Sequence, residues 1–408
     1  MNNDGYDDVI IGSGKADDLG AGYVLFGQPV YIATDPTSDA VMFNDADGDV
    51  VTVVVGGHKL TQDNFDFSAP PQEALIANGT AGQAFFGITL SPDFSGSVVK
   101  IKTQQTGSGD GFTHVGQMNA QDMTLKKLKV IGNVDSIMVG NDTEGTNAVD
   151  TLILQNLGPE SGVGQSVFTG SIGAMKVRGE IRNTDLAVGS GVSDGLKKMI
   201  VNGSVTNSHI ASTGTLKMTV KGDVLDSTFD AALSIRSLSV VGDLINTTIR
   251  AAGDGSSAET AAAQVIKKIV VKGRVENSRI LAGYDDLGQL VNGHAAIGLI
   301  QVKADWIASD LVAGVDAGVG GFFGDGDDTA LGGGGFTLAS RIASVKIKGQ
   351  ILGSASGVDH FGFVAEEIGA FAVGGIPQIL LAGPNNDLAA VDFGADNDVS
   401  LYEVVAPI

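Results

Sequence analysis

Apolar residues occupy every second position in a segment near the middle of the chain. In residues 196–210, Met199, Val201 and Val205 follow this spacing, and Gly203 takes the place between the last two. A period of two puts these residues on one face of a strand. β-Branched residues dominate and glycine is abundant, and both features disfavour a helix. The pattern predicts an inward-facing strand in which the missing side chain of Gly203 marks a bend or a close approach of two backbones.

The same pattern recurs along the chain and indicates a repeat. Residues 266–280 reproduce residues 196–210 with the same spacing, and Gly203, Gly222 and Gly242 are 19 and 20 residues apart. A unit of about 20 residues is too short to fold alone, but stacked copies gain parallel hydrogen-bonded neighbours and close an apolar tube. We therefore expect an all-β chain built as a parallel β-solenoid (β-helix), with loop insertions at one place in the cycle.

A turn position keeps its register with the apolar positions. It is held by Asn183, Asn207, Asp226, Asn246 and Asn277, and Ser or Thr follows each of them. Five unrelated Asx turns would not keep this register. We therefore expect an Asn/Asp ladder and a hydroxyl ladder, which satisfy the backbone groups of stacked turns.

The repeat also predicts what fills the core. The residues expected to stack in one inward column are Val201, Val220, Val240 and Val271. Trp306 falls on the rung position of Val205 and is interpreted as core packing rather than as a platform for sugars.

Composition narrows the functional classes. The 408 residues include 59 Gly and no Cys, with 43% hydrophobic and 6% aromatic residues and a formal net charge of −22. The absence of Cys excludes disulfides, thiolate metal sites and a Cys nucleophile. The acidic balance argues against binding to nucleic acid or to an anionic membrane, because both need a positive field. No apolar run approaches the roughly 18 residues of a membrane span.

The first residues resemble one repeat of the FG-GAP family, of the integrin α-chain type. Residues 2–27 contain an acidic loop, a strand and a Phe-Gly ending, and Asn2, Asp4 and Asp8 match the third, fifth and ninth positions of the family's calcium loop. The resemblance implies a Ca²⁺ site and an extracellular protein; an Asp/Gly-rich turn without metal is the alternative. The loop's first aspartate would precede Met1, and no secretory signal follows Met1. We infer that the chain begins inside a larger protein or that its start is misassigned.

A second acidic cluster leads into a strand-like run. Asp45, Asp47 and Asp49 alternate around Gly48 and precede residues 50–55, which are mostly valine. The segment resembles the "DADGD" openings found in large secreted bacterial multidomain proteins. Oxygen donors at alternating positions suit Ca²⁺, and a plain β-turn fits equally well. The acidic residues 325–328 are interpreted as a loop tip.

The sequence offers little evidence of catalysis. No two of the five histidines have metal-ligand spacing, and neither a G-x-S-x-G elbow nor a P-loop is present. Asp185, His209, Arg279 and Asp310 share one register, but Thr228 and Thr248 interrupt the row. A solvated polar row explains it equally well, so we do not expect an enzyme. The Lys pairs at 126–127, 197–198 and 267–268 suggest a solvated outer face, with a stripe that binds acidic polysaccharide as the alternative.

These observations divide the chain into four parts. They are an FG-GAP-like partial repeat (1–28), a β-rich module or irregular first rungs (29–97), the parallel β-solenoid (98–383), and a C-terminal cap or extended assembly segment (384–408). Neither end of the sequence resembles a dedicated cap, which predicts contacts of the solenoid ends with other copies or adjoining domains, as in a filament. The alternative is a monomer in which residues 29–97 and 384–408 fold back over both ends.

The functional hypothesis is an exported structural or adhesive segment of a bacterial surface or matrix protein. The solenoid resembles the repeat arrays of giant secreted bacterial proteins. The alternative is a carbohydrate-active β-helix enzyme, a polysaccharide lyase or tailspike-like depolymerase. An outer groove lined with carboxylates and aromatic side chains would favour that alternative, and smooth faces with covered ends would favour the structural role.

Overall fold

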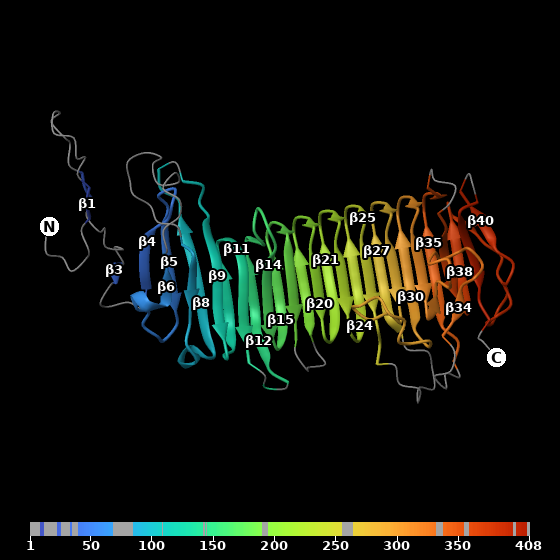
Figure 1. Cartoon of the computed structure of the whole chain (residues 1–408), viewed down its shortest axis with the longest axis horizontal. Helices are drawn as coiled ribbons and strands as arrows, with labels where there is room; N and C mark the ends of the chain where they lie inside the picture. The colour runs from blue at the N-terminus through green and yellow to red at the C-terminus, as the bar shows by residue number, and fades with distance from the viewer. Residues whose placement is uncertain are drawn as a thin grey trace.

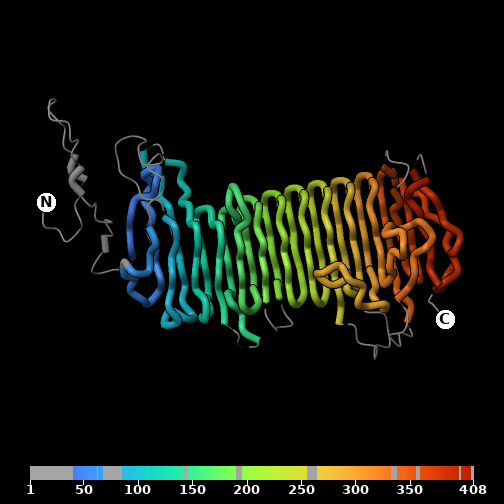
Figure 2. The backbone as a smooth tube through the Cα atoms, in the orientation of Figure 1, coloured from blue at the N-terminus to red at the C-terminus, as the bar shows by residue number. Residues whose placement is uncertain are grey.

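The computed structural model describes residues 40–67, 85–107, 109–141, 143, 145–189, 195–254, 264–331, 338–354, 359–394 and 397–405, together with the backbone of three short strands nearer the N-terminus. The described residues form an elongated stack of β-strands that runs from the N-terminal to the C-terminal end of the chain (Figure 1). The tube drawing shows successive turns of chain lying side by side along this stack (Figure 2). The parallel β-solenoid predicted from the repeat is confirmed.

One face of the stack is a 15-stranded sheet. In spatial order its strands are β3 (Ala33–Thr34), β4 (Ala40–Asn44), β5 (Val50–Val55), β8 (Ser97–Gln104), β10 (Leu125–Val130), β12 (Asn147–Leu154), β15 (Ser171–Val177), β18 (Leu196–Val201), β21 (Thr215–Val220), β24 (Ser234–Val240), β27 (Gln264–Val271), β30 (Ala296–Val302), β35 (Arg341–Ile347), β38 (Glu367–Val373) and β39 (Ile376–Pro377). From β8 to β38 every neighbouring pair is parallel.

Shorter strands complete each turn. Two-residue strands form one row: β13 (Asn156–Leu157), β16 (Ile181–Arg182), β19 (Val205–Thr206), β22 (Val224–Leu225), β25 (Leu244–Ile245), β28 (Val275–Glu276), β31 (Trp306–Ile307) and β36 (Ile351–Leu352). Four- to six-residue strands form the next: β14 (Gly164–Thr169), β17 (Thr184–Val188), β20 (His209–Ser212), β23 (Thr228–Ala231), β26 (Thr248–Ala251), β29 (Arg279–Ala282), β32 (Asp310–Ala313), β37 (Phe361–Ala365) and β41 (Val399–Glu403). Near the N-terminal end, β9 (Thr113–Gln121) and β11 (Gly132–Gly140) run through both rows.

The remaining elements are short. They are β1 (Val9–Ile11), β2 (Tyr23–Leu25), β6 (Phe65–Asp66), β7 (Gly87–Thr89), β33 (Val315–Asp316), β34 (Thr329–Ala330), β40 (Val391–Phe393) and the 3₁₀ turns η1 (Gln62–Asn64) and η3 (Pro92–Phe94). β1 and β2 pair antiparallel, with Ile10 opposite Val24.

The core follows the predicted register. Val201 lies opposite Val220, Val220 opposite Val240, and Val240 opposite Val271, and all four are fully buried. Trp306 is also fully buried, and its ring centroid lies 5.0 Å from that of Phe363. The inward positions therefore form continuous columns along the solenoid.

The glycine position shows both the bend and the close approach of two backbones that the sequence predicts. Gly203 lies at a bend between β18 and β19 rather than on the inward face of one continuous strand. Its N–H donates to the Gly179 carbonyl at 2.6 Å, and a Cβ atom at Gly203 would lie 2.7 Å from that same oxygen. Stacked corners thus bring backbones too close for a side chain, which explains why glycine recurs there.

The predicted turn ladder is present on the next corner. Asn183, Asn207, Asp226, Asn246 and Asn277 all have positive φ, between 47° and 49°. Asparagine tolerates this left-handed conformation better than most residues. The following Ser or Thr is buried in every copy, and its hydroxyl donates to the carbonyl two residues earlier, as in Ser227 to Leu225 at 2.7 Å. The exposed amides and the buried hydroxyls therefore form two separate ladders.

Antiparallel strands close the N-terminal end. β5 runs antiparallel to β8, and β4 runs antiparallel to β5. Beneath them Phe43 and Phe85 are almost fully buried, and the centroid of Phe43 lies 4.9 Å from that of Phe67 and 5.1 Å from that of Phe85. The scarce aromatic residues thus fill the end of the apolar tube.

The C-terminal segment folds back on the last turn. Glu403 is 1% exposed, and its carboxylate accepts hydrogen bonds from Ile368 N of β38 at 2.8 Å and from Asn386 N at 2.8 Å. β39 turns back on β38, and β40 pairs antiparallel with β41. Both ends are therefore covered among the described residues, as in the alternative of segments that fold back over the ends and not as in the expectation of open ends. The covering contacts join segments with no repeat signature, so the repeat pattern could not indicate them.

The glycine-rich excursion after β32 is partly packed. β33 and β34 form an antiparallel pair, and Phe323 is buried in a second small core with Tyr284 and Tyr402. One buried aromatic ring thus anchors an otherwise glycine-rich segment.

Candidate functional site

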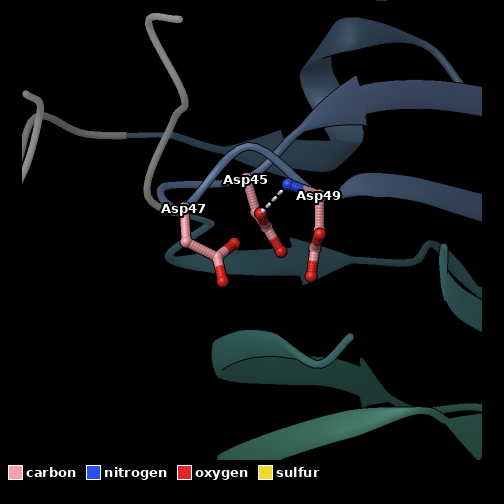
Figure 3. Close-up of side chains that lie close together, drawn as sticks. All are labelled: Asp45, Asp47 and Asp49. Atoms are coloured by element: carbon pink, nitrogen blue, oxygen red, sulfur yellow. Dashed lines mark hydrogen bonds between the residues drawn. The ribbon is translucent and has the colours of Figure 1, made fainter. Parts of the chain in front are cut away.

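The turn between β4 and β5 brings three carboxylates together. Asp45, Asp47 and Asp49 alternate through it, and Gly48 supplies the positive φ of 95° that the bend requires. Asp49 N donates to Asp45 Oδ1 at 2.9 Å, and one oxygen from each carboxylate lies within 4.8 Å of the others. All three side chains leave the turn on the same side (Figure 3). This turn can hold a metal ion through oxygen ligands alone.

The loop between β8 and β9 closes over this turn. Thr106 N and Gly111 N donate to the two carboxylate oxygens of the fully buried Asp49, at 2.7 and 2.6 Å. A Cβ atom at Gly109 would lie 1.8 Å from Asp49 Oδ1, so only glycine fits there. Asp49 therefore joins two segments that are more than 50 residues apart in the sequence.

The acidic turn concentrates negative charge in a partly buried place. Burial raises the pKa of Asp45 to about 8. The hydrogen bond that protonated Asp45 donates to Asp47 and the negative charge of Asp47 act in the same direction. The hydrogen bond with Asp45 lowers the pKa of Asp47 below its usual range. At neutral pH a proton on Asp45 therefore relieves the repulsion between the carboxylates. A bound cation would replace that proton and neutralise the site. The oxygen-only donor set fits a hard cation such as Ca²⁺ or Mg²⁺.

A pocket of about 400 Å³ opens beside the turn. Asp45, Ala46 and Asp47 form one wall, and the other walls come from Phe85, Phe86, Asp110, Phe112, His114, Gly116 and Asp135. The elements that meet there are the β4–β5 turn, the residues before β7, the β8–β9 loop, and the first halves of β9 and β11. The pocket therefore depends on the N-terminal closure of the solenoid.

An imidazole and a carboxylate form a pair in this pocket. His114 Nε2 lies 2.9 Å from Asp135 Oδ2, and the hydrogen bond that the imidazole donates to this carboxylate raises the pKa of His114. The other oxygen, Asp135 Oδ1, is shielded from solvent and has no hydrogen-bond partner among the described residues. The pair thus places an imidazole with a raised pKa and a partly exposed carboxylate beside the cavity.

A second acidic group lies near the other end. One oxygen from each of Asp325, Asp327 and Asp328 lies within 4.8 Å of the others, so this loop can also hold a metal ion. Asp328 accepts hydrogen bonds from Gly324 N at 2.8 Å and from the hydroxyl of Tyr402. The loop tip is therefore tied to the C-terminal strand, a role the sequence did not indicate.

The row on the outer face keeps its predicted register. His209 lies between two carboxylates, 3.1 Å from Asp185 Oδ1 and 2.8 Å from Asp230 Oδ2. Asp230 is almost fully buried and also binds the guanidinium of Arg250 at 2.7 and 3.0 Å. Both imidazole nitrogens are thus engaged by carboxylates, which fits a structural polar network better than a catalytic base.

The sequence-predicted site residues fall into three groups. Asn2, Asp4 and Asp8 lie outside the described residues. The Asn/Asp ladder lies on an outer corner, and the three aspartates of the β4–β5 turn come together as a cluster. The sequence did not indicate Phe86, Phe112 or Asp135, because they come from separate segments with no shared motif.

Comparison with family models, with curated proteins and with solved structures finds no match. In the part of the chain that the structure describes, no helix is long and apolar enough to cross a membrane.

Proposed function

We propose that the chain is an extracellular structural and adhesive β-solenoid, a segment of a bacterial surface or matrix protein. The observation that carries this proposal is the unbroken parallel stack from β8 to β38, whose fully buried columns run the length of one apolar core. Such a rod suits a spacer or scaffold, since each turn contacts only its neighbours and the length is set by repeat number.

Surface location is the first test of this proposal. Antibodies raised against the purified chain should label intact, unpermeabilised cells of its source. Labelling that needs permeabilised cells would contradict it. A cytoplasmic protein detected by the same antibody in the same cells is the control for leakage.

Ca²⁺ bound by Asp45, Asp47 and Asp49 is part of this proposal. The ion would connect the β4–β5 turn with the β8–β9 loop, which already meets Asp49 through two backbone amides. Extracellular modules commonly use weak Ca²⁺ sites of this composition. The role proposed for Ca²⁺ is structural, because it would hold the N-terminal closure together.

The C-terminal end carries the association surface in this proposal. The large apolar side chains exposed there are Ile376 at 68%, Ile379 at 96%, Leu381 at 60% and Leu388 at 51%. Leu381 N donates to Asp387 Oδ2 at 2.8 Å, so the segments around Leu381 and Leu388 lie together. Clustered apolar exposure of this kind is typical of an interaction site. We propose that this surface, rather than open strand edges, joins the rod to a second copy or an adjoining domain.

A carbohydrate-active enzyme is the second candidate. The observation that favours it is the pocket beside the β4–β5 turn, where carboxylates and phenylalanines meet. Release of reducing ends or unsaturated products from a panel of polysaccharides, lost in Asp135→Asn, would support the enzyme. Absence of turnover across the panel would leave the structural and adhesive role.

A further inference from the structure

Two aromatic rings are exposed in the pocket beside the β4–β5 turn. Most other aromatic rings among the described residues are buried. Phe86 is 43% exposed and Phe112 is 38% exposed, and both line the cavity. Phe85 is 3% exposed and joins the cavity to the aromatic cluster at the end of the core. Two rings left in contact with water at one cavity favour a ligand that covers them.

The rings are held in place by the backbone. Gln117 N donates to the Phe86 carbonyl at 2.7 Å, and Phe112 N donates to Asp110 Oδ1 at 2.7 Å. A Cβ atom at Gly116 would lie 2.6 Å from the Phe86 carbonyl oxygen, so glycine allows the segment before β7 to pack directly on β9. The two phenylalanines therefore lie on fixed backbone and not on a free loop tip.

The charges around the cavity have one sign with a single exception. Asp45, Asp47, Asp110 and Asp135 line it, and His114 is the only basic side chain among its described lining residues. His114 is already engaged by Asp135 Oδ2, whereas Asp135 Oδ1 is shielded from water without a described partner. The negative charge of Asp135, whose side chain is partly exposed at the cavity wall, would attract a positively charged group.

The side chains that line the pocket suit an organic cation better than a metal ion. A metal ion seeks oxygen ligands on all sides and gains little from phenyl rings. An organic ammonium ion is attracted to the faces of aromatic rings and to carboxylates at the same time. The volume of about 400 Å³ accommodates a molecule with several heavy atoms rather than a bare ion.

We propose that this pocket binds an organic ammonium ion, an amine carried on an aliphatic or sugar body, with its cationic group between Phe86, Phe112 and Asp135. The inference deepens the adhesive part of the proposed function, on which it rests, by giving the pocket a ligand class. An amino sugar of a surface polysaccharide and a lysine-like alkylamine share this chemistry, and the experiment separates the two sources.

Isothermal titration of the full chain tests the proposal. The probes are n-butylammonium chloride, glucosamine and N-acetylglucosamine, in a buffer with a metal chelator so that no metal ion competes for Asp45 and Asp47. Binding of n-butylammonium points to an alkylamine, and tighter binding of glucosamine points to an amino sugar; either supports the proposal. N-Acetylglucosamine has the same sugar body without the positive charge and should not bind. Equal binding of glucosamine and its N-acetyl form, or no binding of any probe, would overturn the proposal.

Three variants locate the binding. Phe112→Ala should weaken the affinity roughly 2- to 30-fold, the range expected when a cation loses one aromatic face. Asp135→Asn, which keeps the shape of the side chain, should weaken it about tenfold or more. Phe322→Ala, which removes a ring of similar exposure from the excursion after β32, is the matched control and should leave the affinity unchanged.

Melting curves of the variants separate ligand loss from unfolding. Unaltered affinity in both Phe112→Ala and Asp135→Asn, each folded like the parent, would place any ammonium binding elsewhere and refute the assignment. In that case surface labelling of intact cells would still test the structural role independently.

Discussion

Asn207 Nδ2 donates a hydrogen bond to Asn183 Oδ1 at 2.7 Å and so links one turn of the solenoid to the next. The same geometry recurs between Asn246 and Asp226 at 2.9 Å. Beneath this exposed ladder, Ser208 N donates to Ser227 Oγ at 3.2 Å, and Ser227 Oγ donates to the Leu225 carbonyl. These hydrogen bonds satisfy buried backbone groups of the neighbouring turn. The register of the stack is therefore set by hydrogen bonding as well as by apolar packing.

Removal of one buried hydroxyl should destabilise the stack measurably. Ser227→Ala leaves the Ser208 amide buried without an acceptor, so we expect a loss of about 1–3 kcal/mol in the free energy of unfolding. Ser239→Ala, on the outward side of β24, is the control and should change stability by less than about 0.5 kcal/mol. Denaturant unfolding followed by circular dichroism measures both. Equal stability of the two variants would show that the hydroxyl ladder contributes little.

A charge in the inward column tests the core register. Val240→Asp places a carboxylate among Val220 and Val271, where it has no partner, and should cost about 3 kcal/mol or more. The next residue, Val241, is 39% exposed, so Val241→Asp should be tolerated. Thermal melts of the two variants give the comparison. A Val240→Asp protein that melts with the parent would contradict the assigned register.

Ca²⁺ should raise the melting temperature through the β4–β5 turn. At a free concentration 100 times its dissociation constant, a ligand that binds only the folded state stabilises it by about 2.7 kcal/mol. We expect a chelator to lower the melting temperature, added Ca²⁺ to restore it, and Asp47→Asn to abolish most of the response. Asp93→Asn, in the exposed η3 turn, should keep it. Identical melting temperatures with and without chelator would show that the cluster is a turn that binds no metal ion.

The stability of the metal-free protein should depend on pH through the titration of Asp45. Its folded pKa of about 8 lies above the ordinary value of 3.8, so folding favours the protonated form. This contribution to stability is complete below about pH 4 and is lost as the pH rises through 8. Asp310 and Asp328, with pKa values raised by burial to about 7 and about 6, change stability in the same direction. Asp45→Asn should therefore flatten the fall in melting temperature between pH 7 and 8, where Asp328 has largely titrated and Asp310 is already half ionised or more. An unchanged slope in that variant would assign the effect to other groups.

The middle of the fold could be predicted from the sequence because its contacts repeat. Val201 and Val220 share a position in the unit, and stacking units with a common register puts them opposite each other. The same reasoning locates Asn207 beside Asn183. The spacing of a sequence repeat thus predicts the long-range contacts of a solenoid.

The contacts at the two ends of the solenoid and in the pocket do not repeat, so the sequence pattern does not predict them. Glu403 accepts a hydrogen bond from Ile368, and Asp49 accepts one from Gly111, across separations that no period relates. The three aspartates of the β4–β5 turn could be recognised because they are neighbours in sequence. The pocket residues Phe86, Phe112 and Asp135 could not, since only the closure of the N-terminal end brings their segments together.

The central claim is that this chain is a structural rod that joins another molecule through its C-terminal apolar surface. Static light scattering of the purified chain over a wide concentration range tests self-association at that surface directly. We predict a mass that rises with concentration and returns to that of the monomer in the double variant Ile379→Ser and Leu381→Ser. Leu287→Ser, which removes an apolar side chain that is 77% exposed in the insertion after β29, should leave the rise unchanged. A monodisperse monomer at high concentration, with the parent and the double variant indistinguishable, would contradict self-association through this surface.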